Sequence, residues 1–271
     1  MSNKSLNNNL YNIENWFREK TSKVIIAFSG GVDSCLVAFL ANKFLGKENV
    51  FAIISASPSL KQKDLTIAID FCKQFEINLE IIETKEMEDT RYSSNPVNRC
   101  YFCKINLYDE LQNISLKYPD SIIVNGQNFD DLSDYRPGIE AAKEFKVYHP
   151  LADCKLSKNE IRELARYFNL PTSDKPASPC LSSRIPYGSE VTHKKLRQIE
   201  AAENILNDFG FHDVRVRHYN NLAKIEVPTN RLEELLNVQE DISQKILQLG
   251  FDRFEIDKEG LVSGKLNRLI I

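Results

Sequence analysis

The sequence has 271 residues, of which 27% are charged, and its formal net charge is −3. This balance gives no overall basic field, so nucleic acid is not an expected partner. No apolar run approaches the length of about 18 residues that a membrane span needs, and the first ten residues lack the apolar core of a signal peptide. We therefore expect a cytoplasmic protein without membrane partners. Its six cysteines are expected to be thiols or metal ligands rather than disulfides.

The first half of the chain alternates short apolar runs with helical patterns. Four strands are predicted, at Val24–Phe28, Val50–Ser55, Leu79–Glu83 and Ser121–Val124. Three helices are predicted between them, at Asp33–Phe44, Lys61–Phe75 and Lys104–Tyr118. A further helix is expected from the capping box at Ser157 to about Pro171. This βαβ rhythm predicts an α/β fold with a parallel sheet.

Prolines and polar residues interrupt this rhythm at residues 172–190, which we interpret as a functional loop. The remaining segments predict helix, strand, strand, helix and strand, at His193–Asp208, Asp213–His218, Leu222–Val227, Arg231–Leu249 and Phe251–Asp257. The expected domains are a larger α/β domain at residues 1–171 and a small α+β domain at 191–271. The loop at 172–190 joins them, and the small domain is expected to serve substrate binding or oligomerisation.

A strand, a glycine turn and a helix start follow one another directly at residues 24–35. Glycines allow close approach to a ligand, and the N–H groups of a helix start favour bound phosphate. The turn is not a Walker A motif, which requires a lysine. It resembles the S-G-G-x-D-S signature of the PP-loop ATP pyrophosphatases, which cleave ATP between the α and β phosphates. The resemblance implies ATP binding by Ser29, Gly30, Gly31, Asp33 and Ser34. Asp33 could also hold Mg²⁺, or could merely cap the helix.

A second polar cluster follows the fourth predicted strand and is expected at the same edge of the sheet as the glycine turn. Its paired carboxylates could hold Mg²⁺ or orient the nucleotide, although such clusters are commonly plain turns. An arginine in this cluster could pair with a phosphate. The further candidates for ATP binding are Ser55, Gly126, Asp130, Asp131 and Arg136.

Three cysteines have the surroundings of metal ligands. Cys100 and Cys103 are separated by two residues, and Cys180 lies in the proline-rich loop. Three thiolates could hold a [4Fe–4S] cluster with one iron open, whereas a Zn²⁺ site usually needs a fourth ligand. A redox dithiol or unconnected thiols are the other interpretations. Cys35 and Cys72 lie in apolar helical stretches and are expected in the core.

Together these segments resemble the LarE family of ATP-dependent sulfur transferases, which act in the biosynthesis of the nickel-pincer cofactor. The resemblance is carried by Ser29–Ser34, Asn98–Lys104, Asp130–Gly138, Cys180–Gly188 and Gly260–Asn267. It implies that ATP adenylates a carboxylate of pyridinium-3,5-biscarboxylic acid mononucleotide, with release of pyrophosphate. Sulfur then replaces AMP. The implied catalytic residues are Cys180, Asp33, Ser34 and Arg184.

The source of the sulfur separates two forms of this family. In members with a single cysteine, the residue that matches Cys180 gives up its own sulfur and becomes dehydroalanine. The present sequence looks like the three-cysteine variant, in which Cys100, Cys103 and Cys180 hold a [4Fe–4S] cluster that carries the transferred sulfide. The implied partners are a mononucleotide substrate, a sulfide source and further copies of the same chain.

The resemblance also assigns residues to the phosphate of the mononucleotide. These are Ser183, Arg184, Arg215 and Arg217. The i, i+2 spacing of the last two predicts that both guanidinium groups lie on one face of a strand. A solvent-exposed sheet face is the alternative. Nearby Glu200 and Glu203 could bind a metal, but are interpreted as surface charge.

Other functions remain open at this point. A tRNA-thiolating enzyme also combines a PP-loop with cysteines, but would be expected to show a basic surface. An amide-forming ligase such as NAD or GMP synthetase would have no evident use for three converging cysteines. A sensor or iron–sulfur scaffold that binds ATP without turnover is an alternative outside the enzymes.

Overall fold

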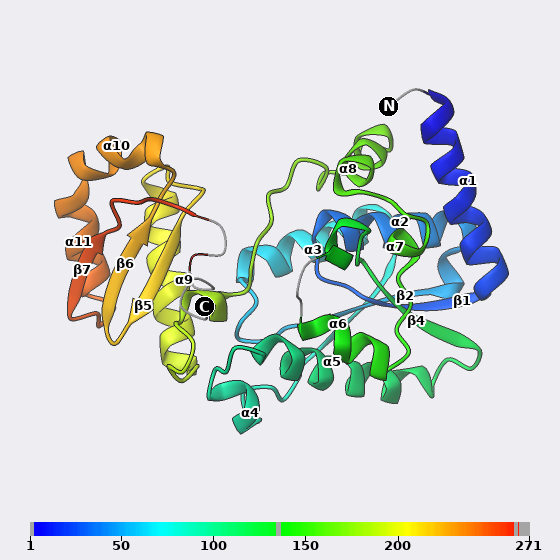
Figure 1. Cartoon of the computed structure of the whole chain (residues 1–271), viewed down its shortest axis with the longest axis horizontal. Coiled ribbons are helices and arrows are strands. Elements are labelled where there is room, and N and C mark those ends of the chain that lie inside the picture. The colour runs from blue at the N-terminus through cyan, green and yellow to red at the C-terminus, as the bar shows by residue number, and fades with distance from the viewer. Residues whose placement is uncertain (1–2, 134–136, 263–264, 266–271) are drawn as a thin grey trace. The chain divides into compact units, whose positions relative to one another are not determined.

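The computed structural model describes residues 3–133, 137–262 and 265 (Figure 1). The chain divides into two compact units. The first unit comprises residues 1–86 and 100–178, and the second comprises 87–99 and 179–271. The limits expected from the sequence place residues 87–99 in the first domain, whereas this division places them in the second unit.

The first unit is built on a parallel four-stranded sheet in the order β3-β2-β1-β4, which confirms the predicted α/β fold. Its strands are β1 (Lys23–Ala27), β2 (Val50–Ser55), β3 (Asn78–Ile82) and β4 (Ser121–Asn125). Each predicted strand lies within one residue of the observed start and end. Apolar runs of this length, bounded by polar turns, are typical of strands that are covered on both faces.

Helices cover both faces of this sheet (Figure 1). Ile26 packs with Leu40 and Leu164 on one face, while its neighbour Ile25 packs with Tyr108 and Ala141 on the other. The helices of the first unit are α1 (Asn3–Lys20), α2 (Val32–Leu45), η1 (Lys47–Asn49), α3 (Gln62–Gln74), α5 (Arg99–Ser115), η2 (Asp130–Ser133), α6 (Pro137–Glu144), α7 (Pro150–Asp153) and α8 (Lys158–Tyr167). Among the residues that the structure describes, no helix is both long enough and apolar enough to cross a membrane.

The start of α8 agrees with its predicted capping box. Ser157 Oγ accepts a hydrogen bond from the backbone N–H of Glu160, and the Glu160 carboxylate accepts one from the backbone N–H of Ser157. By contrast, α5 begins at Arg99, five residues before the predicted start at Lys104. Cys100 and Cys103 therefore lie on the helix itself rather than ahead of it.

The second unit packs helices against a three-stranded sheet in the order β5-β6-β7, with β5 and β6 antiparallel and β6 and β7 parallel. Its core includes Leu206, Val216, Ile225 and Ile246. Its elements are α4 (Thr90–Ser93), η3 (Leu181–Arg184), α9 (His193–Asp208), β5 (Arg215–Tyr219), β6 (Leu222–Glu226), η4 (Thr229–Arg231), α10 (Leu232–Asn237), α11 (Gln239–Leu247) and β7 (Arg253–Ile256). The helix predicted at Arg231–Leu249 is thus two helices, separated at Val238.

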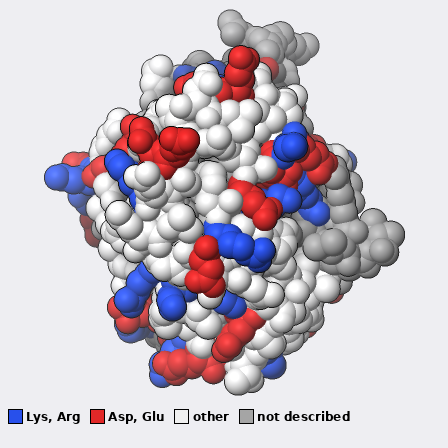
Figure 2. All heavy atoms as spheres, turned by 90° about the vertical axis from the view of Figure 1, so that its left-hand side faces the viewer, with Lys and Arg blue, Asp and Glu red and all other residues white. Residues whose placement is uncertain are grey.

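Charged side chains of both signs are interspersed on the face of the molecule in Figure 2. No continuous field of one sign is visible on that face, in keeping with the small net charge of the sequence.

A fully buried histidine makes the second unit sensitive to acid. His218 lies in β5, with Nε2 3.2 Å from Gln198 Oε1 and the ring packed on Phe251. Burial, together with the nearby positive charge of Lys195, lowers the pKa of His218 from 6.5 to about 4. The unfolded chain therefore binds a proton between these pH values that the folded chain does not, so stability falls as the pH falls through this window.

We expect His218 to account for about 3 kcal/mol of the stability lost between pH 6.5 and pH 4, because one pKa unit corresponds to about 1.4 kcal/mol. Chemical denaturation of wild type and His218→Gln across this range measures the contribution. The variant should lose less stability on acidification than the wild type. Equal losses in the two proteins would contradict the assignment.

Candidate functional site

The PP-loop lies between β1 and α2 and is held by its own hydroxyl groups. Ser34 Oγ donates to the carbonyl oxygen of Gly31 at 3.1 Å and accepts from the backbone N–H of Ser29 at 3.3 Å. The Ser29 hydroxyl lies 3.1 Å from Ser34 Oγ and, since the Ser34 proton is already used, is the donor of that pair. The loop ends at the N-terminus of a 14-residue helix, where backbone N–H groups and the helix dipole favour a bound phosphate.

Two glycines allow neighbouring atoms to pack closer to this loop than any side chain at these positions would permit. A Cβ added to Gly126 would lie 2.6 Å from Ser34 N, and one added to Gly30 would lie 2.8 Å from Ala68 Cβ. Gly30 also has a φ of +67°, which favours glycine. Gly126 therefore packs directly on the start of α2, so the structure brings the two predicted glycine segments together. Such a cradle fits a phosphate chain.

Asp33 forms an ion pair with a lysine that was not among the predicted site residues. Lys158 Nζ lies 2.5 Å from Asp33 Oδ2, and Asn128 Nδ2 lies 3.4 Å from Asp33 Oδ1. The Asp130 carboxylate accepts a hydrogen bond from the backbone N–H of Lys158 at 2.8 Å, and thereby fixes the start of α8 against η2. In the sequence, the predicted helix cap at Ser157 was the only local indication of where Lys158 would lie, because Lys158 is the next residue.

The other predicted residues of this edge have different roles. Asp131 and Asn128 close a turn, with each side chain accepting a hydrogen bond from the other residue's backbone N–H. Ser55 ends β2, at the edge where the PP-loop follows β1. Arg136 lies outside the described residues.

A second lysine holds the PP-loop from the proline-rich segment. Lys175 Nζ donates to the carbonyl oxygen of Gly30 at 3.1 Å and lies 2.9 Å from Asp64 Oδ1. Ser178 donates to the other oxygen of Asp64 at 2.6 Å. Burial opposes ionisation of Asp64, but the hydrogen bonds from Ser178 and Lys175 outweigh it and lower the pKa of this carboxyl group. Lys175 thus joins the loop to α3.

The cysteines fall into two groups. Cys35 and Cys72 are buried, as expected, and burial raises the pKa of each to about 12. Cys100 is exposed and Cys103 half-buried, and their i, i+3 spacing on α5 places both on one side of the helix. Cys180 is half-buried and precedes η3 in the second unit. The first unit therefore gathers two of the three predicted cluster ligands. Within the described residues, no three His, Cys, Asp or Glu side chains form a metal-binding group.

In the second unit, a buried ion pair holds the turn around Cys180. Arg184 Nε lies 2.8 Å from Glu203 Oε1, with only 2% and 3% of these side chains exposed. The Nη1 group of Arg184 donates to the carbonyl oxygens of Pro179 at 2.8 Å and Cys180 at 3.2 Å, and to Ser183 Oγ at 2.9 Å. The interpretation of Glu203 as surface charge was therefore wrong, because a buried guanidinium requires its carboxylate.

The two arginines of β5 differ in what they bind. Arg217 is buried against Glu226, with Nη2 2.9 Å from Oε2, and its Nη1 donates to the carbonyl oxygen of Ser183 at 2.7 Å. Arg215 is half-buried and has no ion pair with a carboxylate among the described residues. Burial and the neighbouring charges of Arg217 and Arg184 lower its pKa. Of the three arginines predicted to bind the phosphate of the mononucleotide, Arg215 is the one without a carboxylate partner among the described residues.

Residues 87–99 contribute a support for the Cys180 turn that the sequence analysis missed. Arg99 Nη1 donates to the carbonyl oxygen of Ser182 at 2.9 Å and to Asn95 Oδ1 at 2.6 Å. Asn95 is fully buried and donates in turn to the carbonyl oxygen of Pro186 at 2.7 Å. The Tyr92 hydroxyl lies 2.6 Å from Ser182 Oγ. The buried side chains of Tyr92, Asn95 and Arg99 therefore hold this turn through hydrogen bonds.

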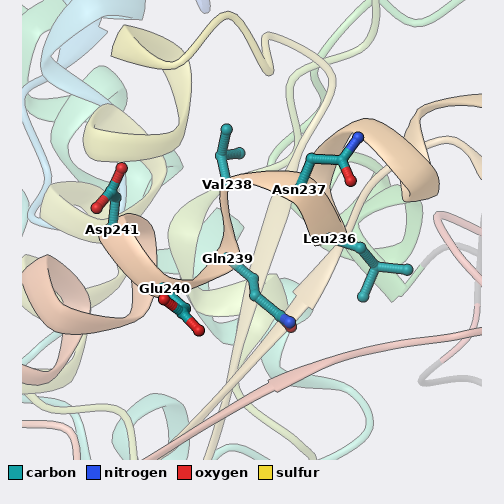
Figure 3. Close-up of a pocket in the computed structure, with 6 residues that line it drawn as sticks. All are labelled: Leu236, Asn237, Val238, Gln239, Glu240 and Asp241. Carbon is teal, nitrogen blue, oxygen red and sulfur yellow. The ribbon is translucent and has the colours of Figure 1, made fainter.

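A separate pocket of about 320 Å³ lies where α10 meets α11 (Figure 3). It is lined by Leu236, Asn237, Val238, Gln239, Glu240 and Asp241. None of these is a predicted site residue, and carboxylates stand at the N-terminus of α11, where an anion would otherwise bind.

The parallel sheet, with a glycine cradle after β1, defines an ATP-binding domain of the PP-loop ATP pyrophosphatase class. In agreement, residues 9–108 match the NAD synthase family. The chain is 32% identical over 245 residues to pyridinium-3,5-bisthiocarboxylic acid mononucleotide synthase of Lactiplantibacillus plantarum, covering 90% of this chain and 89% of that protein. The chain belongs to the family of this synthase, the LarE family.

Two further relatives show how far the similarity extends. An uncharacterized protein of Synechocystis sp. is 43% identical over 270 residues, 98% of this chain and 99% of that protein. A GMP synthase of Prochlorococcus marinus is 28% identical over 216 residues, 69% of this chain and 40% of that enzyme. The similarity to the first of these therefore includes both units.

Proposed function

We propose that the protein is an ATP-dependent sulfur transferase that converts a carboxylate of pyridinium-3,5-biscarboxylic acid mononucleotide into a thiocarboxylate. The observation that carries the proposal is the PP-loop cradle, in which Gly126 packs on Ser34 at the N-terminus of α2. The named relative from Lactiplantibacillus plantarum supplies the substrate class.

The first step is adenylation. A carboxylate oxygen of the substrate attacks the α-phosphorus of ATP, the bond to the β-phosphate oxygen breaks, and pyrophosphate leaves. Backbone N–H groups at the start of α2 would stabilise the charge on the phosphates. Mg²⁺ would offset further phosphate charge, and Asp33 is the carboxylate that we propose as its ligand. Binding of the ion would require Asp33 to exchange its contact with Lys158, which would then be free to bind phosphate.

The substrate's own phosphate requires a separate cationic site. Arg215 is the strongest candidate, because the guanidinium groups of Arg184 and Arg217 are already neutralised by buried glutamates. Arg184 and Arg217 would instead position Ser183, because Arg184 donates to its hydroxyl oxygen and Arg217 donates to its carbonyl oxygen. A phosphate beside Arg215 would supply the negative partner that its half-buried guanidinium lacks among the described residues.

In the second step, sulfur attacks the acyl carbon, the bond to the AMP oxygen breaks, and AMP leaves. We propose that Cys100, Cys103 and Cys180 hold a [4Fe–4S] cluster. When bound, the cluster supplies a sulfide as the nucleophile. Support comes from the i, i+3 spacing of Cys100 and Cys103, which places both thiols on one side of α5. In the alternative route, Cys180 attacks through its own sulfur and is left as dehydroalanine.

Anaerobic turnover with ATP, inorganic sulfide and the dicarboxylate mononucleotide tests this proposal. We expect bound iron and acid-labile sulfide, pyrophosphate release that depends on the substrate, and several thiocarboxylates per chain with Cys180 intact by mass spectrometry. Cys100→Ser should limit the yield to at most one product per chain, because only Cys180 could then donate sulfur. Cys154→Ser, a half-buried cysteine outside the predicted ligand set, is the matched control.

Each alternative has its own outcome in this experiment. Absence of iron and sulfide, with loss of sulfur from Cys180, would establish the sacrificial route. Nucleotide binding without pyrophosphate release would favour a sensor. Thiolation of tRNA would favour the RNA-modifying class. Assembly from several copies and a cytoplasmic location stay predictions.

A further inference from the structure

Lys265 neutralises a pair of neighbouring carboxylates in the second unit. Glu226 ends β6 and Asp257 directly follows β7, and the register of these parallel strands makes the two residues neighbours. Lys265 Nζ lies 2.6 Å from Asp257 Oδ2 and 3.6 Å from Glu226 Oε1. It also donates a hydrogen bond to the carbonyl oxygen of Gly260 at 3.1 Å. Because like charges on adjacent strands repel, Lys265 acts as the shared counter-ion of the two carboxylates.

The contacts of these groups favour their charged forms. Burial opposes the charge on Lys265, but the hydrogen bond to Asp257 and the charge of Glu226 outweigh it and raise the pKa of Lys265. Burial likewise opposes ionisation of Asp257, but the hydrogen bond from Lys265 helps to lower the pKa of that carboxyl group. Glu226 binds the guanidinium of Arg217 through Oε2, and Lys265 faces its other oxygen. The carboxylate of Glu226 is therefore shared between two cations.

Glu226 also stands opposite Arg215, the candidate for binding the phosphate of the substrate. The two residues form a cross-strand pair of β5 and β6, so their side chains project from the same face of the sheet. Burial and the neighbouring arginines lower the pKa of Arg215, whereas the charge of Glu226 opposes that shift. The ion pairs of Glu226 are nevertheless with Arg217 and Lys265. Released from these cations, Glu226 would compete with a phosphate for Arg215.

We propose that Lys265 is a positioning residue that holds Glu226 away from Arg215 and thereby sets the affinity for the phosphate of the mononucleotide. The inference rests on the proposed function, because it takes Arg215 as the ligand of that phosphate. Loss of the charge of Lys265 would leave Glu226 beside Asp257 without their shared counter-ion, and a turn of Glu226 toward Arg215 would relieve the repulsion. Arg215 would then be neutralised from within the protein, and the phosphate would lose its cationic partner.

Calorimetric binding of pyridinium-3,5-biscarboxylic acid mononucleotide and of its dephosphorylated nucleoside to the full-length protein tests this inference. The dissociation constant of the nucleoside divided by that of the mononucleotide measures what the phosphate contributes to affinity. Lys265→Gln removes the charge but can still donate hydrogen bonds to Asp257 and to the Gly260 carbonyl oxygen. We expect it to reduce this ratio about tenfold, the worth of one charge-assisted hydrogen bond, and to leave the affinity for the nucleoside unchanged. Lys265→Arg should restore the wild-type ratio.

A matched control and a second background separate this role from a structural one. Lys224→Gln removes a cation whose ion pair is with Asp257, at 3.4 Å, and should leave the ratio unchanged. In a Glu226→Gln protein, Lys265→Gln should have no further effect on the ratio, because the competing charge is absent. An equal fall in both backgrounds would show that Lys265 acts without Glu226 and would overturn the inference.

The inference and the proposed function fail in different ways. Glu226→Gln alone keeps an acceptor for Arg217 and should not lower the ratio, so a fall in this variant contradicts the inference even if Lys265→Gln fails to fold. If the wild-type protein binds the mononucleotide and Lys265→Gln has the same ratio, the inference is overturned and the proposed function stands. If the wild-type protein does not bind the mononucleotide, both are overturned.

Discussion

Replacement of Glu203 by alanine is expected to cost about 3 to 5 kcal/mol of the free energy of unfolding. The variant leaves the guanidinium of Arg184 without a carboxylate in a site where only 2% of its side chain is exposed. It also removes the acceptor for the backbone N–H of Val216. Denaturant unfolding measures the effect. Since Arg184 holds the carbonyl oxygens around Cys180, sulfur transfer should fall together with stability.

An exposed pair of the same chemistry provides the control. Arg231 and Glu234 form a contact of 2.5 Å on the surface of the second unit. Water solvates either partner when the other is removed, so Glu234→Ala should leave the unfolding curve nearly unchanged. A loss in Glu203→Ala no larger than that in Glu234→Ala would show that Arg184 finds another partner or reaches solvent.

Replacement of Gly126 by alanine is expected to lower ATP affinity at least a hundredfold and to cost about 3 kcal/mol of stability. The added Cβ would lie 2.6 Å from Ser34 N and 2.9 Å from Ser34 Cα. These are backbone atoms that cannot rotate away, so either β4 or the start of α2 must shift. The shift moves the N–H groups that would face the phosphates. Nucleotide calorimetry and denaturant unfolding measure the two effects.

Gly31→Ala is the steric control for the stability measurement. Its Cβ would meet only Ser29 Oγ, at an ordinary 3.5 Å, and the φ of −81° suits any residue. The expected change in the free energy of unfolding is small. Similar losses of stability in Gly31→Ala and Gly126→Ala would contradict the close approach of Gly126 as the cause.

The strands and most helices were predictable because local patterns determine them. Apolar runs gave the four parallel strands, and the Ser157 capping box gave the start of α8. The helix α1 was missed although Leu6, Leu10, Ile13 and Phe17 follow a helical spacing, because its many asparagines are poor helix formers. The early start of α5 was missed because Pro96 and the polar residues around it are typical of a loop.

The candidate site was less predictable, because its pairings are tertiary. The glycine turn carries its chemistry in consecutive residues, so its atoms could be assigned. The partner of Asp33 is 125 residues away along the chain, and the partner of Arg184 is 19 residues away on another helix. Nothing in the local sequence distinguishes a glutamate that neutralises a buried arginine from one on the surface. The network of Lys175, Asp64 and Ser178 was missed for the same reason.

The division of the chain gives the second unit a discontinuous sequence. Residues 87–99 supply Tyr92, Asn95 and Arg99 to the turn around Cys180, although the intervening residues 100–178 belong to the first unit. A fragment that begins at residue 179 would leave the partners of these three side chains unsatisfied. The second unit is therefore not a detachable module, and grafting it onto another ATP-binding domain would require both of its segments.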